Sequence, residues 1–282
     1  MLRKGDLTQG GITGTLLHFT LPMLVGSFLQ QCYNIADTLI VGQCIGAGAL
    51  AAVGSAYTLM VFLISVLLGL AMGSGTVFSL HYGAGNHVAL RRSIFSSFAL
   101  IGIVTLILNV VVFIWLDPIL RLLQVPQDIY GMMRSYLWII FCGIVFTFIY
   151  NFYASLLRAV GDSVTPLWFL AVSVVLNIAL DLFFILQLDW GIQGAAAATV
   201  LAQGVAALGI IIYTYRRRPE LRWHHEDMCF DRTCLKEIAS FSTLTCVQQS
   251  VMNLGILMVQ GLVNSFGTAV MAAFAAAVKI DS

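Results

Sequence analysis

Two aspartates lie inside stretches of this chain that are otherwise apolar. Asp37 belongs to an apolar run that begins near Leu16, and Asp181 belongs to a later run. An ionised carboxylate at the centre of a membrane helix costs about 2.5–3.5 kcal/mol on insertion scales, so it needs a partner, a water-filled cavity or a proton. The chemistry expected of such a group is the binding and release of a proton or a cation.

Amide and phenol side chains accompany the first aspartate at helical spacing. Steps of three and four residues place four polar side chains on one face of a helix, namely Gln30, Tyr33, Asn34 and Asp37. The rest of that helix is apolar. The spacing therefore predicts a helix that turns one side toward a cavity and the other side toward lipid or protein.

A second polar stripe leads to the second aspartate, because Asn177 and Ser173 precede Asp181 at steps of four residues. Counted from the expected outer helix ends at about 1.5 Å per residue, Asp37 and Asp181 lie at nearly the same depth, in the outer half of the bilayer. Other expected helices bring three more polar side chains to a similar level: Tyr136, Thr199 and Gln203. This convergence predicts one shared polar pocket, although ordinary helix–helix hydrogen bonding is an equal alternative for those three.

Two carboxylates in one dry pocket are costly to keep ionised together, because burial and mutual repulsion both favour the protonated form. We therefore expect Asp37 and Asp181, with Asn177, to bind and release a proton or cation as the pocket faces each side in turn. A proton that moves inward down 100 mV yields about 2.3 kcal/mol, which can drive export of a substrate. The alternative for each aspartate is a helix cap or a structural hydrogen bond.

The composition indicates an integral membrane protein, since 60% of the 282 residues are hydrophobic and only 10% are charged. Uniform apolar runs favour a helical bundle over a β-barrel. The net charge of +1 gives no sign of nucleic-acid binding. The six cysteines are scattered and predict no disulfide framework.

Seven apolar segments are long enough to span a bilayer, and an eighth begins near Ala269. The expected spans are about 15–41, 52–80, 93–116, 133–156, 165–187, 192–214 and 238–264. Most of the fourteen Lys and Arg residues fall on the side of the N-terminus. We therefore expect a multi-pass protein of the plasma membrane, with the N-terminus and the 215–237 loop in the cytoplasm.

A weak internal repeat divides the chain. Gln30-Gln31 recurs as Gln248-Gln249, and the stretch 46–53 is echoed by 267–274. The first and seventh helices run in the same direction, so the repeat predicts two like-oriented units of six helices. The expected organisation is a six-helix lobe over 1–214, a connecting loop over 215–237 and the incomplete start of a second lobe over 238–282.

Three segments resemble the multidrug and toxic compound extrusion (MATE) family, most closely its DinF-like branch. They are Tyr33-Asn34-Ile35-Ala36-Asp37 running to Gly42, Leu157–Asp162 running to Thr165-Pro166, and Asn177-Ile178-Ala179-Leu180-Asp181. The resemblance implies twelve helices in two six-helix lobes around a central cleft. It also implies exchange of H⁺ or Na⁺ for small organic cations. Under it, Asp37, Asn177 and Asp181 match the cation-coupling site of the first lobe, with Thr199 close by.

The chain departs from the family pattern in two respects. Some members carry an acidic residue in the seventh helix, where this chain has Gln248, Gln249 and Asn253. That difference argues against the NorM-type sodium site, and Gln249 and Asn253 are expected to line the substrate cavity instead. The length resembles the first lobe plus the start of the second, so a truncated transporter, or a fragment that pairs with a complementary second lobe, is expected.

The sequence favours a secondary active exporter of organic cations over other functions. A flippase for lipids or lipid-linked saccharides would favour basic residues toward the cavity, and Lys279 is the only basic residue within an expected segment. An intramembrane aspartyl protease needs two carboxylates in close contact, but its usual Gly-x-Gly-Asp turn is absent. The His and Cys residues of 223–229 match no standard zinc spacing, so a solvated connector is favoured. No metal, cofactor or enzymatic activity is expected.

Overall fold

The computed structural model of the chain describes residues 12–222 and 232–281, and helices dominate both ranges without any strand. The predicted all-helical membrane fold is thus confirmed. The α-helices are α1 (Ile12–Cys44), α2 (Ala47–Gly83), α3 (His87–Leu122), α4 (Gln127–Cys142), α5 (Ile144–Ala159), α6 (Val164–Leu182), α7 (Gly191–Arg217), α8 (Arg232–Asn264) and α9 (Thr268–Asp281). A π-helical turn, Phe183–Gln187, extends α6, and a 3₁₀ turn, Pro219–Leu221, follows α7.

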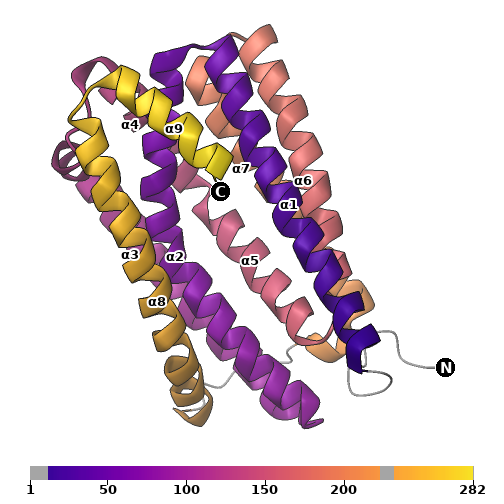
Figure 1. Ribbon diagram of the computed structural model, residues 1–282. Helices are drawn as coiled ribbons and strands as arrows, with labels where there is room; N and C mark the ends of the chain where they lie inside the picture. The colour runs from indigo at the N-terminus through magenta and orange to yellow at the C-terminus, as the bar shows by residue number, and fades with distance from the viewer. Residues whose placement is uncertain (1–11, 223–231, 282) are drawn as a thin grey trace.

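Most of these helices are long and apolar enough to cross a membrane. Within the described ranges, five helices meet that standard: α2, α3, α6 with its π-helical end, α7 and α8. The bent pair α4 and α5 makes a sixth span. Helix α1 is as long, but amide and acidic side chains interrupt its apolar surface. The helices lie side by side along the long dimension of the molecule (Figure 1).

The predicted span 133–156 is not one straight helix, because the structure divides it into α4 and α5, which are bent by 49° with Gly143 between them. Helix α7 packs closely on the break: a Cβ on Gly143 would lie 2.5 Å from Cγ2 of Val200. Asn109 of α3 donates to the backbone carbonyl of Phe141 at 2.6 Å, and so satisfies a carbonyl at the bend. The bend thus depends on contacts from distant helices, and one of them pairs a backbone carbonyl beside the break.

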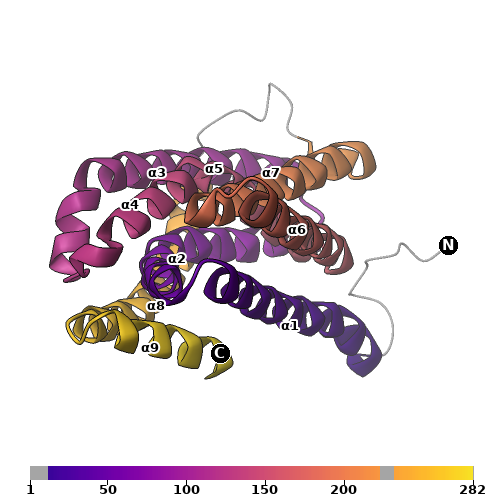
Figure 2. The ribbon, with the colours of Figure 1, turned by 90° about the horizontal axis from the view of Figure 1, so that it is seen from above.

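Helix α2 is central to the bundle. Seen from above, it lies between the helices α5 to α7 on one side and the pair α8 and α9 on the other (Figure 2). A buried cluster of aromatic rings joins α2, α3 and α5: Phe78, Phe98, Phe148, Phe152 and Tyr153. Large apolar side chains on the outer faces of the helices are exposed, as expected for surfaces that contact lipid.

Small residues allow α8 to approach α2 closely, between the second half of α2 and the first half of α8. A Cβ on Gly69 would lie 2.5 Å from Cα of Cys246, and one on Gly73 would collide with the backbone of Ser242. The hydroxyl of Ser242 also donates to the backbone carbonyl of Leu70 at 3.3 Å. This is the close, small-residue packing that drives helix association in membranes, where lipid is as apolar as the side chains.

At the other end, amides and hydroxyls join the same two helices. Gln260 Nε2 donates to Ser55 Oγ at 2.9 Å and to Asn264 Oδ1 at 2.8 Å. Thr58 Oγ1 donates to Gln260 Oε1 at 3.3 Å, and Asn264 Nδ2 donates to the carbonyl of Leu123 at 2.8 Å. We call these four side chains, Ser55, Thr58, Gln260 and Asn264, the seam network.

The internal repeat is visible in the backbone. The turn between α1 and α2 contains Gly46 at φ +115°, and the turn between α8 and α9 contains Gly267 at φ +92°. In each turn the glycine carbonyl accepts the first hydrogen bond of the next helix, from Leu50 N or Met271 N, at 3.1 Å. Helices α8 and α9 thus repeat the local geometry of α1 and α2, which supports the predicted repeat.

Candidate functional site

A cavity of about 370 Å³ lies among α1, α2, α4, α5, α6 and α7. Polar side chains line it on several sides, with apolar residues such as Met60 and Ile64 between them. Eight of the side chains predicted from the sequence lie on its wall: Gln30, Tyr33, Asn34, Asp37, Tyr136, Asn177, Thr199 and Gln203. The structure thus brings together residues from four helices, α1, α4, α6 and α7.

The polar side of α1 faces this cavity, as its spacing predicts. Asn34 and Asp37 are only 7% and 8% exposed, whereas Ile35 and Leu39, on the opposite side, are 41% and 54% exposed. Asn34 Nδ2 also donates to Gln31 Oε1, one turn earlier, at 2.9 Å. Helical periodicity alone therefore accounts for how α1 presents a carboxylate to a hollow while it keeps apolar side chains outward.

Asp181 lies behind the wall and reaches the cavity through Asn177. The Asn177 amide satisfies its neighbours when its nitrogen donates to Asp181 Oδ2 at 2.8 Å. Its oxygen then accepts from Thr199, from Oγ1 at 3.3 Å and from the backbone nitrogen at 3.1 Å. The hydroxyl of Tyr33 lies 3.4 Å from Thr199 Oγ1, which links α1 to the same chain of contacts. We call Tyr33, Asn177, Asp181 and Thr199 the carboxylate chain.

One oxygen of this chain is left without a donor. Asp181 is fully buried, and among the described residues its Oδ1 has no hydrogen-bond partner. A buried anionic oxygen without a donor is costly, whereas a bound proton or cation would remove that cost. This oxygen can therefore accept a proton or a cation.

The backbone changes form directly after this carboxylate. Helix α6 continues into the π-helical turn Phe183–Gln187, where Leu188 N donates to Phe183 O at 3.3 Å. Tight packing accompanies the turn, because a Cβ on Gly194 would lie 3.0 Å from Cβ of Phe184. π-Helical turns are rare and frequently occur at functional sites. Sequence reasoning missed this turn, since the run 165–187 is uniformly apolar apart from its polar stripe.

A second polar group was also missed. Thr147 Oγ1 donates to Gln203 Oε1, and Asn151 Nδ2 donates to the carbonyl of Thr147 at 2.8 Å. Thr147 and Asn151 line the cavity from α5, and Tyr57 lines it from α2. Thr147 and Asn151 are four residues apart, as are Asn177 and Asp181. The same spacing could therefore have predicted that Thr147 and Asn151 line the cavity.

Two predicted residues lie elsewhere. Gln249 and Asn253 belong to α8, which is on the far side of α2 from α5 to α7 (Figure 2). Neither lines the cavity that contains Asp37. Asn253 Nδ2 donates to the backbone carbonyl of Gln249 at 2.8 Å, a bond within one helix turn. The structure therefore does not bring these two amides together with the carboxylates.

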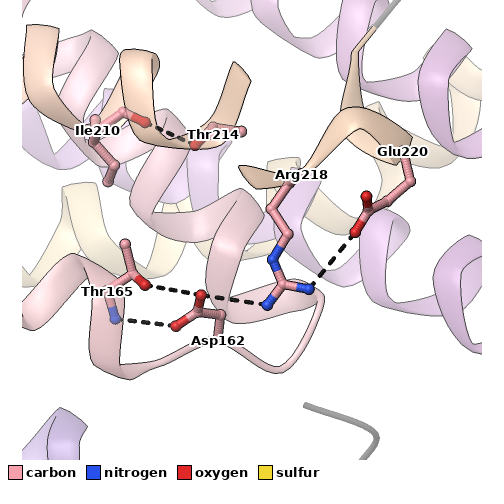
Figure 3. Close-up of polar contacts among 6 residues, drawn as sticks. All are labelled: Asp162, Thr165, Ile210, Thr214, Arg218 and Glu220. Carbon is pink, nitrogen blue, oxygen red and sulfur yellow. Dashed lines mark hydrogen bonds and ion pairs between the residues drawn. The ribbon is translucent and has the colours of Figure 1, made fainter. Parts of the chain in front are cut away.

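The turn before α6 lies outside the cavity and connects α6 to the end of α7 (Figure 3). Gly161 has a φ of +87°, and Asp162 Oδ1 accepts the backbone N–H of Thr165 at 3.0 Å. Arg218 Nη2 lies 3.4 Å from the other oxygen, Asp162 Oδ2, and Arg218 Nη1 lies 3.6 Å from Glu220 Oε1. The segment Leu157–Asp162 therefore caps α6 and fastens it to the end of α7.

The predictions for the loop 223–229 fall outside the described residues. Within residues 12–222 and 232–281, no group of three or more His, Cys, Asp or Glu side chains is placed to hold a metal ion. The N-terminal basic residues Arg3 and Lys4, which contribute to the predicted orientation, also lie outside the described ranges.

Known proteins resemble this chain in sequence. A model of the MatE family matches residues 22–183 of the chain. The probable multidrug resistance protein YpnP of Bacillus subtilis is 32% identical over 288 residues, which cover 100% of this chain and 63% of that protein. The multidrug export protein MepA of Staphylococcus aureus is 30% identical over 202 residues, which cover 70% of this chain and 44% of MepA.

A solved structure shows the same fold. The inward-facing conformation of a multidrug resistance MATE family transporter of the MOP superfamily matches with a TM-score of 0.81 at 25% identity. The match covers 94% of this chain and 61% of that one. The chain thus spans less than two thirds of the length of each of these three proteins.

Proposed function

The chain belongs to the MatE family, and from that premise we propose that it exports organic cations in exchange for H⁺ or Na⁺. The names of its relatives, multidrug resistance and multidrug export proteins, support multidrug efflux as the activity. They are names of transporters, which also argues against an intramembrane protease. In this proposal the N-terminus lies in the cytoplasm and the chain acts with a complementary second lobe.

The observation that carries the proposal is the unpartnered oxygen of Asp181 at the end of the carboxylate chain. A coupling ion needs a site that holds it in one state and gives it up in another. Asp181 is buried behind Asn177, whereas Asp37 is on the cavity wall. A proton or sodium ion bound between these carboxylates neutralises the site, and its departure leaves a negative charge that attracts an organic cation.

The remaining wall suits an amphipathic cation. Tyr57, Tyr136 and Tyr150 surround the cavity together with apolar side chains, and among the described residues no basic side chain lines the wall. Aromatic faces attract cations, and apolar side chains favour the hydrocarbon part of a drug-like molecule. The absence of a basic residue on this wall favours a cation exporter over a flippase for anionic lipids.

Efflux of ethidium from cells that express this chain together with a complementary second lobe tests the proposal. The pH gradient and the sodium gradient are collapsed separately while ethidium retention is followed by fluorescence. We expect efflux above that of cells without this chain, and its loss when one of the two gradients is removed. Efflux that survives collapse of both gradients would refute exchange, and retention equal to that of control cells would refute export.

A further inference from the structure

A second hollow of about 430 Å³ lies between α1, α5 and the start of α6. It shares part of its wall with the first cavity, through Gln30, Gln31, Tyr150, Asn151 and Leu170. The charge on its wall is opposite in sign to the charge on the wall of the first cavity. Within residues 12–222 and 232–281, Arg158 is the charged residue on its wall, and no acidic residue lines it.

Arg158 differs from Arg218 and Arg222, two arginines at that end of the molecule whose donors are engaged. Arg218 pairs with Asp162 and Glu220, and Arg222 donates to the backbone carbonyl of Tyr215. For Arg158, by contrast, the described part of the chain supplies no hydrogen-bond acceptor or carboxylate. A guanidinium with free donors that faces a hollow is a site for a carboxylate or a phosphate.

The neighbouring backbone reinforces the positive potential. Ser163 and Pro166, at the N-terminus of the nineteen-residue helix α6, line the same hollow. A helix N-terminus carries partial positive charge and attracts anions. The nearby carboxylate of Asp162 does not line the hollow, and its oxygens are engaged by Thr165 and Arg218 (Figure 3).

The position of the hollow indicates what kind of anion reaches it. Trp168, one turn into α6, is 68% exposed, and exposed tryptophans mark the headgroup level of a membrane. Met23, Leu167 and Leu170 form an apolar part of the wall beside Arg158. The wall thus offers donors for a phosphate and an apolar surface for a chain attached to it.

We propose that this hollow binds one anionic phospholipid, with its phosphate on Arg158 and its acyl chain along the apolar wall. This inference needs only that the chain is embedded in a membrane, so it stands or falls separately from the export of cations. The lipid would occupy the space next to Gln30 and Asn151, which both hollows share.

Native mass spectrometry of the purified 282-residue chain, titrated with phosphatidylglycerol in detergent, tests the proposal. We compare Arg158→Gln with a matched control, Arg217→Gln, an exposed arginine at the end of α7. Removing a charge-assisted hydrogen bond to phosphate should weaken retention of the first lipid about tenfold in Arg158→Gln and leave Arg217→Gln unchanged. Phosphatidylcholine should bind more weakly than phosphatidylglycerol, and inorganic phosphate should not displace the lipid.

A second pair of variants keeps the test decisive if Arg158→Gln does not fold. Ser27→Trp fills the hollow from α1, whereas Leu24→Trp places the same ring on the exposed side of that helix. We expect Ser27→Trp to lose the bound lipid and Leu24→Trp to keep it. Equal retention in Arg158→Gln and Arg217→Gln, equal retention in the two tryptophan variants, or displacement by inorganic phosphate would overturn the proposal.

Discussion

The carboxylate chain and the seam network are both clusters of buried polar side chains in an apolar bundle, yet they are completed differently. In the seam network, each of Ser55, Thr58, Gln260 and Asn264 has a hydrogen-bond partner, and the network closes on the carbonyl of Leu123. In the carboxylate chain, Asp181 Oδ1 has no donor among the described residues. One cluster is saturated, and the other has capacity for a further ligand.

This difference separates structural from functional polar groups. A saturated network holds two helices together and gains little from a further ligand, because each of its side-chain polar atoms already has a partner. An unsaturated cluster beside a cavity contains a buried polar atom without a partner. This arrangement is unfavourable, and a bound ion would relieve it. Local sequence does not distinguish them, since Gln260 and Asn264 have the same spacing of four as Asn177 and Asp181.

The largest effect expected is that of Asp37→Asn. The substitution keeps the shape of the side chain and removes the charge on the cavity wall, so ethidium efflux should fall to background while the protein stays folded. Efflux and size-exclusion profiles measure the two properties. Asp117→Asn is the control, because Asp117 is a carboxylate outside the cavity that pairs with exposed Arg134 at 2.8 Å. Full activity in Asp37→Asn would remove that carboxylate from the coupling site.

Gly73→Leu, in the packing of α2 on α8, is expected to reduce stability, whereas Asp37→Asn is expected to abolish efflux and leave the protein folded. A side chain there collides with the backbone of Ser242, and overpacking of this kind costs about 1–3 kcal/mol or more. We expect loss of the folded protein and not a selective loss of efflux, as measured by thermal stability in detergent. Gly83→Leu is the control, because nothing lies within 4 Å of its Cβ position. Equal stability of the two variants would contradict the close approach.

A smaller loss of stability is expected from Asn264→Leu. The change leaves the carbonyl of Leu123 without its donor and the hydroxyl of Ser55 without its acceptor, at a cost of about 1–3 kcal/mol. The melting temperature should fall, while ethidium affinity per folded molecule stays the same. If affinity fell and stability did not, the seam network would be part of the binding site and the comparison would fail.

The smallest effect expected is that of Thr199→Val on transport. Valine keeps the shape but removes the hydroxyl that joins Asn177 to Tyr33, so efflux should slow by roughly three- to tenfold. Thr214→Val is a matched control on the same helix, since each hydroxyl donates to the carbonyl four residues earlier (Figure 3 shows Thr214). Equal efflux rates in the two variants would show that the hydroxyl of Thr199 contributes only its hydrogen bond within α7.

Periodicity and composition predicted much of this molecule, because both are local properties. Long apolar runs located the helices, and steps of three and four residues placed Asn34 and Asp37 on the inner side of α1. The bend at Gly143 was not predictable, since it depends on Val200 and Asn109 from other helices. The separation of Asn253 from the cavity likewise depends on where α8 packs, which no local pattern specifies.

The most direct test of the central claim, that the carboxylate chain holds an exchangeable positive charge, is the pH and Na⁺ dependence of ethidium binding. Fluorescence titration of the purified chain gives the Kd for the natural sequence and for Asp181→Asn. If the coupling ion competes for this site, the Kd of the natural chain rises as pH falls or as Na⁺ increases, and that of Asp181→Asn changes little. The same dependence in both proteins, or none in the natural chain, would contradict the account.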